Sequence, residues 1–93
     1  MFTPLASVDI EEAYAWYETQ QAGLGGNFRS ALATVWRLLD QFPGGGPEVH
    51  RDLRRVLVPH FPYAVYYRVV GSSIEVRGCL HQHQNPQAWR RRA

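Results

Sequence analysis

The residues best suited to chemistry lie in the second half of the chain. Arg54 and Arg55 precede an aromatic segment, Tyr63 to Val70, and a second strand-like segment then leads to His81. All ten permanent cations are arginines, whose planar guanidinium groups suit the recognition of carboxylates, phosphates or bases. Histidine is a common general acid or base, so His81 could take that role, although a hydrogen-bonded histidine at a strand end is the commoner case.

Metal binding and nucleophilic catalysis have little support in the sequence. His81 and His83 would share a strand face, but no Cys or carboxylate cluster accompanies them, so we expect no metal and no cofactor. Cys79 is the single cysteine, which excludes an internal disulfide. No Cys/His/Asp triad is evident, so Cys79 is expected to be a half-buried apolar residue and not a nucleophile.

Charge is distributed unevenly along the chain. Residues 1–50 contain two arginines and six carboxylates, whereas residues 51–93 contain eight arginines and two carboxylates. The chain therefore has an acidic front and a basic back. The run Arg90, Arg91 and Arg92 could bind phosphate or a carboxylate-rich partner, or it could be a solvated tail, and the sequence leaves both open.

Length and hydropathy indicate one domain over residues 1–93. The chain is 45% hydrophobic, so it is globular, and at this size a modest stability is expected. No stretch reaches the ~18 consecutive apolar residues of a membrane span, and the N-terminus lacks a secretion-signal pattern. We expect a soluble cytoplasmic protein without membrane contact.

The elements that must position these residues begin with two helices. Thr3-Pro4 is a strong helix start, and three- and four-residue apolar spacing then continues to about Gln21. A second helix is predicted from about Gly26 to Gln41, with Phe28, Leu32, Val35 and Leu39 on its buried side. Because only a short glycine turn separates them, the two helices should form an antiparallel hairpin.

The remaining segments read as strands followed by a short helix. Strands are predicted over Arg54–Val58, Tyr63–Val70 and Ile74–Leu80, and Asn85-Pro86 begins a short C-terminal helix or tail. The fold class is therefore α+β: an N-terminal helical hairpin packed on one face of a small, mainly antiparallel three- to four-stranded sheet, with a short C-terminal helix or tail.

The two-residue turn Gly71-Ser72 predicts a strand register. It places Arg68 opposite Glu75 as a cross-strand ion pair, and it continues with the pairs Tyr67–Val76, Tyr66–Arg77 and Ala64–Cys79. We expect the helices to cover an apolar face made by Val65, Tyr67, Val69, Ile74, Val76 and Leu80. The opposite face would then be open and would carry Tyr66, Arg68, Glu75, Arg77, Cys79 and His81.

Several ordered motifs resemble those of the ParE/RelE toxin superfamily of bacterial type II toxin–antitoxin, or plasmid stabilisation, systems. They are the segment Asp9 to Glu18, Gly23-Leu24-Gly25 with Phe28, Arg54-Arg55, Phe61-Pro62-Tyr63 with Tyr66-Tyr67-Arg68, and His81 with Pro86 and Trp89. The resemblance covers nearly the whole chain. It implies the same fold and a growth-inhibiting toxin that is neutralised by a cognate antitoxin protein encoded beside it.

The resemblance implies two sets of site residues. In a RelE-like, ribosome-dependent mRNA endonuclease, Arg54, Arg55 and Arg68 would lie near the scissile phosphate and His81 would transfer a proton. In either branch, antitoxin or target binding would use Tyr66, Arg68, Arg77, His83, Trp89, Arg90 and Arg91. Tyr63 and Tyr66 could stack on bases, but packed tyrosines are the commoner case.

Two departures from the family pattern bear on the prediction: the shortened start favours a non-toxic remnant, and the scarcity of cations around Gln84 disfavours a nuclease. Only Met1-Phe2 precede the helix start, where family members usually have a full strand, and the segment around Gln84 carries fewer cations than a nuclease would need. We therefore predict a ParE-like toxin, which the family's behaviour implies would bind DNA gyrase without catalysis. The alternatives are the RelE-like nuclease acting on ribosome-bound mRNA and a non-toxic remnant that retains antitoxin binding.

Overall fold

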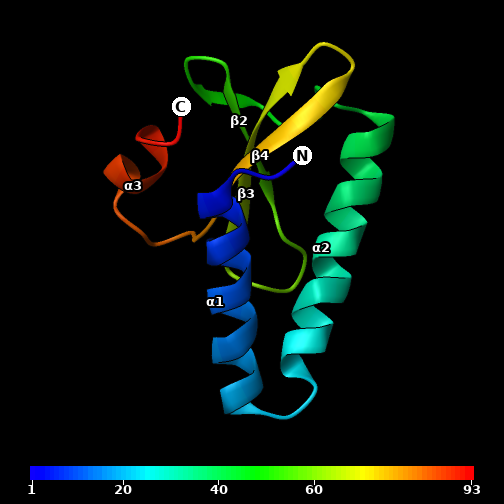
Figure 1. The fold of residues 1–93 in the computed structure, drawn as a ribbon, viewed down its shortest axis with the longest axis vertical. Coiled ribbons are helices and arrows are strands. Elements are labelled where there is room, and N and C mark those ends of the chain that lie inside the picture. The colour runs from blue at the N-terminus through cyan, green and yellow to red at the C-terminus, as the bar shows by residue number, and fades with distance from the viewer.

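The computed structural model describes all 93 residues and confirms the predicted α+β class (Figure 1). Two helices precede a four-stranded sheet, and a short helix follows it. No helix combines the length and the apolar character needed to cross a membrane. The elements are α1 (Pro4–Gln20), α2 (Leu24–Gln41), β1 (Glu48–His50), β2 (Leu53–Leu57), β3 (Tyr63–Val70), β4 (Ser73–His81) and α3 (Pro86–Arg90).

The helical hairpin begins and turns as the sequence predicts. The Thr3 side-chain oxygen accepts a hydrogen bond from the Ala6 amide at 3.2 Å, which caps α1. Gly23 adopts a φ of +90°, a left-handed conformation that glycine tolerates best, and α2 starts directly after it. The Gly25 amide then donates to Glu18 Oε1 at 2.8 Å, so the start of α2 is fastened to the end of α1.

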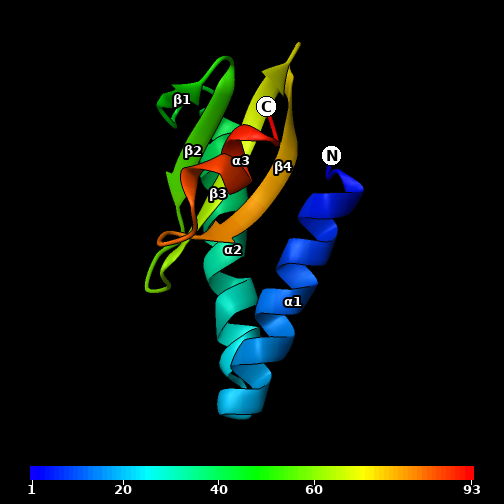
Figure 2. The same ribbon diagram turned by 90° about the vertical axis from the view of Figure 1, so that its left-hand side faces the viewer.

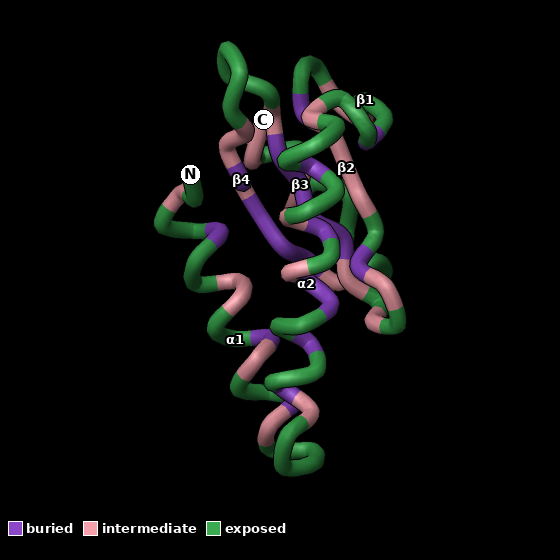
Figure 3. The backbone as a smooth tube through the Cα atoms, turned by 90° about the vertical axis from the view of Figure 1, so that its right-hand side faces the viewer, coloured by how far each residue is buried: buried purple, intermediate pink, exposed green.

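The sheet separates the hairpin from the C-terminal helix. All strands pair antiparallel in the order β1-β2-β3-β4. Figure 2 shows α3 against the near side of the sheet and α2 behind it. We call the side that packs on α1 and α2 the helix face, and the opposite side the back face. Figure 3 shows buried backbone concentrated in β3 and β4.

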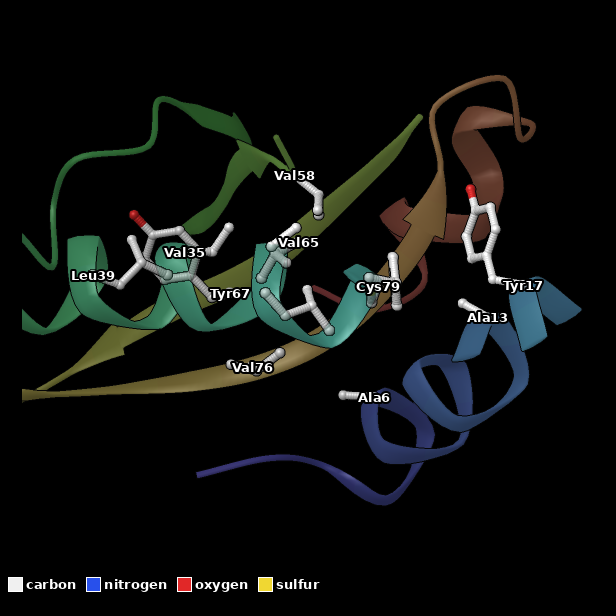
Figure 4. Packing of buried hydrophobic residues seen from close by; sticks show 13 residues of the cluster. Ala6, Ala13, Tyr17, Val35, Leu39, Val58, Val65, Tyr67, Val76 and Cys79 are labelled. Carbon is white, nitrogen blue, oxygen red and sulfur yellow. The ribbon is translucent and has the colours of Figure 1, made fainter. Parts of the chain in front are cut away.

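The helix face carries the main hydrophobic core. Val35 and Leu39 from α2 and Ala6, Ala13 and Tyr17 from α1 pack on the sheet (Figure 4). Phe28 from α2 belongs to the same cluster. The sheet contributes Val65, Tyr67, Val76 and Cys79, and Val58 joins them from just beyond the end of β2. Burial of this apolar surface is the main source of folding free energy.

A second, smaller core lies on the back face. Leu53, Ala64, Tyr66 and Leu80 are buried there, and α3 covers them with Ala88 and Trp89. The predicted open face is therefore wrong over its centre, because the short C-terminal helix folds back across the sheet.

A β-bulge explains why the predicted register holds for only half of the β3–β4 hairpin. The pairs from Val70–Ser73 to Tyr67–Val76 are confirmed, but Tyr66 lies opposite Gly78 and Ala64 opposite Leu80. The predicted Tyr66–Arg77 and Ala64–Cys79 pairs are wrong because Arg77 is one extra residue in β4. Beyond a bulge the side chains change faces. Cys79 and His81 consequently lie on the helix face, and Leu80 lies on the back face.

The outer edge of β4 is closed by groups from distant parts of the chain. The Val76 amide donates to the Met1 carbonyl at 2.8 Å, and the Thr3 amide donates to the Val76 carbonyl at 2.9 Å. Phe2 thus forms a parallel bridge with Val76, in place of a full first strand. Farther along, the Cys79 amide donates to Asp9 Oδ2 at 3.0 Å. At the opposite side of the sheet, no strand lies beyond β1.

Candidate functional site

The back face gathers most of the predicted binding residues. Arg55 and Tyr66 are opposite each other on β2 and β3, and the Arg55 guanidinium carbon lies 5.8 Å from the centre of the Tyr66 ring. Arg68 follows Tyr66 by two residues and therefore points to the same side. Arg77, at the bulge, also reaches this side, where it contacts Glu75.

Tyr66 itself is covered by the C-terminal helix. Its ring stacks on Trp89 with centroids 5.6 Å apart and an interplanar angle of 11°, and the residue is only 1% exposed. Burial raises the pKa of the Tyr66 hydroxyl, although the nearby Arg55 charge acts in the opposite direction. The expectation of an exposed Tyr66 is therefore wrong, and Trp89 is the half-exposed aromatic on this surface.

The back face has more positive than negative charge. Glu75 Oε1 accepts from Arg77 at 2.6 Å and lies 3.7 Å from Arg68 Nε, so one carboxylate serves two arginines. Arg68 also lies 3.7 Å from Asp52, whereas Arg55 forms no ion pair. The Nε atoms of Arg55 and Arg68 are buried without a hydrogen-bond partner. Because these Nε atoms are closed to an incoming group, an acidic or phosphate-bearing partner would have to bind the terminal guanidinium nitrogens of the two arginines.

The last arginine of the C-terminal segment is fixed, and the two before it are exposed. Arg92 donates to Asp9 at 2.8 and 3.3 Å and to the Arg77 carbonyl at 2.9 Å, while Arg77 Nε donates back to the Arg92 carbonyl. Arg92 is therefore not part of a solvated tail. Arg90 and Arg91 are exposed, and Arg90 lies 5.5 Å from the centre of the Trp89 ring.

The four residues proposed for RNA cleavage do not converge. Arg55 and Arg68 lie on the back face. Arg54, as its alternation with Arg55 predicts, points to the other side, donates to the Gly44 and Gly46 carbonyls at 3.2 and 2.7 Å, and pairs with Glu48. His81 also lies on the helix face, with its ring 5.4 Å from that of Tyr63, which packs on Phe28.

His81 and Cys79 are held in structural contacts. The His83 amide donates to His81 Nδ1 at 3.1 Å, and His83 is exposed. No three potential metal ligands come together. Cys79 is 1% exposed on the helix face, so its predicted half-buried place on the open face is wrong. Burial raises the pKa of the Cys79 thiol to about 12, which keeps it protonated at neutral pH.

Sequence reasoning missed two features that shape the back face. The bulge has a signal, because Gly78 interrupts a β-branched segment and an isolated glycine in a strand indicates a bulge. The Asp9–Arg92 pair has no local signal, because its partners are 83 residues apart in the sequence. This pair, together with the Trp89–Tyr66 stack, fixes the cover of the sheet.

Comparisons with known proteins agree with this architecture. A solved structure described as "Chromosomal ParDE TA system from P. aeruginosa" matches with a TM-score of 0.73 and 19% sequence identity, covering 86% of this chain and 90% of that chain. No curated protein matches the sequence. The family model for "ParE toxin of type II toxin-antitoxin system, parDE" matches residues 1–86. The chain therefore belongs to the ParE toxin family, and it is the toxin component of a type II toxin–antitoxin module whose partner is a cognate antitoxin.

Proposed function

We propose that this toxin arrests growth by binding an essential cytoplasmic target, DNA gyrase, through its basic back face, and that it does not cut RNA. The proposal concerns the target and the mode of action, since family membership gives only the toxin role. Binding would use the exposed Arg90 and Arg91 and the half-exposed Trp89 and Arg68. The half-buried Arg55 and Arg77 lie on the same face.

The observation that carries this proposal is the separation of Arg68 and His81 by the sheet. Cleavage of RNA by its 2′-hydroxyl needs a proton acceptor, a proton donor for the leaving group and cations around the same phosphate. Arg55 and Arg68 could contact a phosphate on the back face, but the neighbouring histidine points to the helix face. Cations without a proton-transfer residue favour binding over catalysis.

The charge on the back face supports a binding role independently. Arg55, Arg90 and Arg91 form no ion pair, and Arg68 and Arg77 share Glu75. An excess of guanidinium groups beside an aromatic ring is a favourable composition for a protein interface. It would attract an acidic surface and speed association at low salt.

The proposal is tested by inducing the toxin without its antitoxin and mapping new 5′ ends in translated mRNAs. We expect growth arrest with intact mRNAs, and inhibition of DNA supercoiling when the purified toxin is added to gyrase. Replacing Arg90 and Arg91 together with Ala should weaken gyrase inhibition by about ten- to hundredfold, because exposed interface arginines each contribute on the order of 1 kcal/mol or more. His81→Ala is the matched variant on the other face and should inhibit gyrase as the parent does.

New cuts within reading frames that disappear in His81→Ala would overturn the proposal in favour of the RelE-like nuclease. Growth arrest with intact mRNA and fully active gyrase would reject gyrase as the target. If induction has no effect on growth while the antitoxin still binds, the chain is a non-toxic remnant.

A further inference from the structure

A cleft of about 480 Å³ lies between α1 and the end of β4, outside the back face. Its lining includes Asp9, Glu12, Trp16, Tyr63, His81 and Arg92. We propose that this cleft receives a lysine or arginine side chain of the antitoxin. The inference rests on the toxin–antitoxin family assignment, and it does not depend on which target the toxin inhibits.

The charge balance of the cleft favours a cation. The Asp9 carboxylate is neutralised within the structure, because it accepts from Arg92 and from the Cys79 amide. Glu12 forms no ion pair and is exposed at the mouth of the cleft. One negative charge is therefore left without a partner, beside walls that exclude part of the solvent. A guanidinium or ammonium group placed there would gain a charge-assisted hydrogen bond.

The aromatic lining suits the same ligand. Trp16 is 55% exposed although it is a large apolar side chain, and it lies one helical turn beyond Glu12 on α1. A cation between a carboxylate and an indole ring is attracted by both the charge and the ring quadrupole. Tyr63 responds to the negative charge of the cleft. The pKa of its hydroxyl is raised first by burial and then by Cys79, Asp9 and Glu12.

A protein side chain is a better occupant than a free small cation. Leu5 and Val8 are exposed on the same side of α1 as Glu12, so the cleft continues into an apolar strip. A peptide that packs on this strip can place a basic residue in the cleft. The acidic α1 and the basic back face then require opposite charges from the antitoxin, which would fix the direction in which it wraps the toxin.

The test measures the affinity of purified toxin variants for the purified antitoxin encoded beside the toxin gene. Glu12→Gln should weaken binding about tenfold or more, since it removes the charge but keeps the shape. Glu11→Gln is the matched control, because it lies next to Glu12 and causes the same change in net charge. Glu11 instead pairs with Arg29 on α2 at 2.9 Å, so its substitution should change affinity by less than about twofold.

Single replacement of each Lys and Arg of the antitoxin by Met then identifies the occupant. One of these variants should lose as much affinity as Glu12→Gln, and combining the two should cost little more than either alone. Equal affinities of the Glu11 and Glu12 variants, or additive effects with every basic residue, would overturn the proposal. Because binding is measured directly, this result is independent of gyrase inhibition.

Discussion

Tyr66 and Tyr67 are neighbours in the sequence, yet they belong to opposite sides of the sheet and differ in what buries them. Tyr67 is 0% exposed under the two long helices, and its hydroxyl accepts from the Gly46 amide at 2.9 Å. Tyr66 is 1% exposed under the five-residue helix α3 and stacks on Trp89. Two side chains can therefore be equally buried although the elements that cover them differ in stability. The helix face is covered by α1 and α2, which form the main core. The back face is covered only by the short helix α3, which is held by few contacts.

The largest effect is expected from the helix face. Phe28→Ala should lower the free energy of unfolding by about 3–5 kcal/mol, because it removes a fully buried ring that contacts Tyr17, Phe61 and Tyr63. For a domain with a total of roughly 5–15 kcal/mol this approaches global unfolding. Urea denaturation followed by circular dichroism measures it. A decrease in the free energy of unfolding of less than about 1 kcal/mol would contradict the view that the helix face supplies most of the stability.

The second effect concerns the pair that fixes the C-terminal segment. Asp9→Ala should cost about 2–4 kcal/mol, because it leaves the Arg92 charge and the Cys79 amide without their partner in a largely buried site. Thermal unfolding together with hydrogen exchange should show α3 opening before the sheet. Uniform loss of protection throughout the chain would show instead that the cover and the core form one cooperative unit.

The loop that donates a hydrogen bond to Tyr67 can be tested with two glycine variants, at Gly46 and Gly44. A Cβ at Gly46 would lie 2.5 Å from the Arg55 carbonyl oxygen, whereas a Cβ at Gly44 meets nothing within 4 Å. Gly46→Ala should therefore destabilise by about 1–3 kcal/mol, through displacement of the loop and strain on the hydrogen bond to Tyr67. Gly44→Ala should be close to neutral in the same denaturation experiment, and equal losses in both variants would refute the close approach.

Removing the Trp89 ring from α3 should destabilise the back face locally. Trp89→Ala removes the ring stacked on Tyr66 and should cost about 1–2 kcal/mol, less than Phe28→Ala because Trp89 is only half-buried. Faster hydrogen exchange should be confined to α3 and the neighbouring strands. Retained protection at Leu80 and Ala64 would indicate that α3 stays in place without the stack.

The smallest effect is a dependence of stability on alkaline pH. The folded state keeps the Cys79 thiol protonated up to a pKa of about 12, while the unfolded thiol ionises near 9. Between these values the unfolded state binds fewer protons, so stability falls as pH rises, by about 1 kcal/mol at pH 10. Denaturant midpoints at pH 8.5 and 10 measure this fall. Cys79→Ala should make the fall shallower, and an unchanged slope would assign it to the tyrosines.

The helices and the main core could be predicted from the sequence because their signals are local. The Thr3-Pro4 start and the apolar spacing of Phe28, Val35 and Leu39 each depend on residues within a few turns of one another. The β3–β4 register was also predictable next to its turn. It failed beyond Arg77 because a single inserted residue reverses the faces of all that follow.

The candidate site was harder to predict because its geometry depends on contacts between distant residues. Alternation and the turn correctly place Arg68 and Arg77 on one side of the sheet. For Arg54 and Arg55, alternation predicts only that they point to opposite sides. The burial of Tyr66 and the fixed position of Arg92 could not be foreseen, because both require α3 to fold back over the sheet. Nothing in the pattern predicts the three-residue strand β1 either, since Glu48–His50 is too short to show a period.

The closed edge of β4 has a consequence for self-association. Met1, Thr3 and Asp9 bind outward-facing backbone groups of Val76 and Cys79, so the more open edge for another strand lies beside β1 and the end of β2. A protomer with a single open sheet edge cannot pair with other copies on both sides. Two copies that meet through this side present closed edges outwards, and growth stops at a pair. The occupied edge of β4 thereby disfavours open-ended addition of further copies to the sheet.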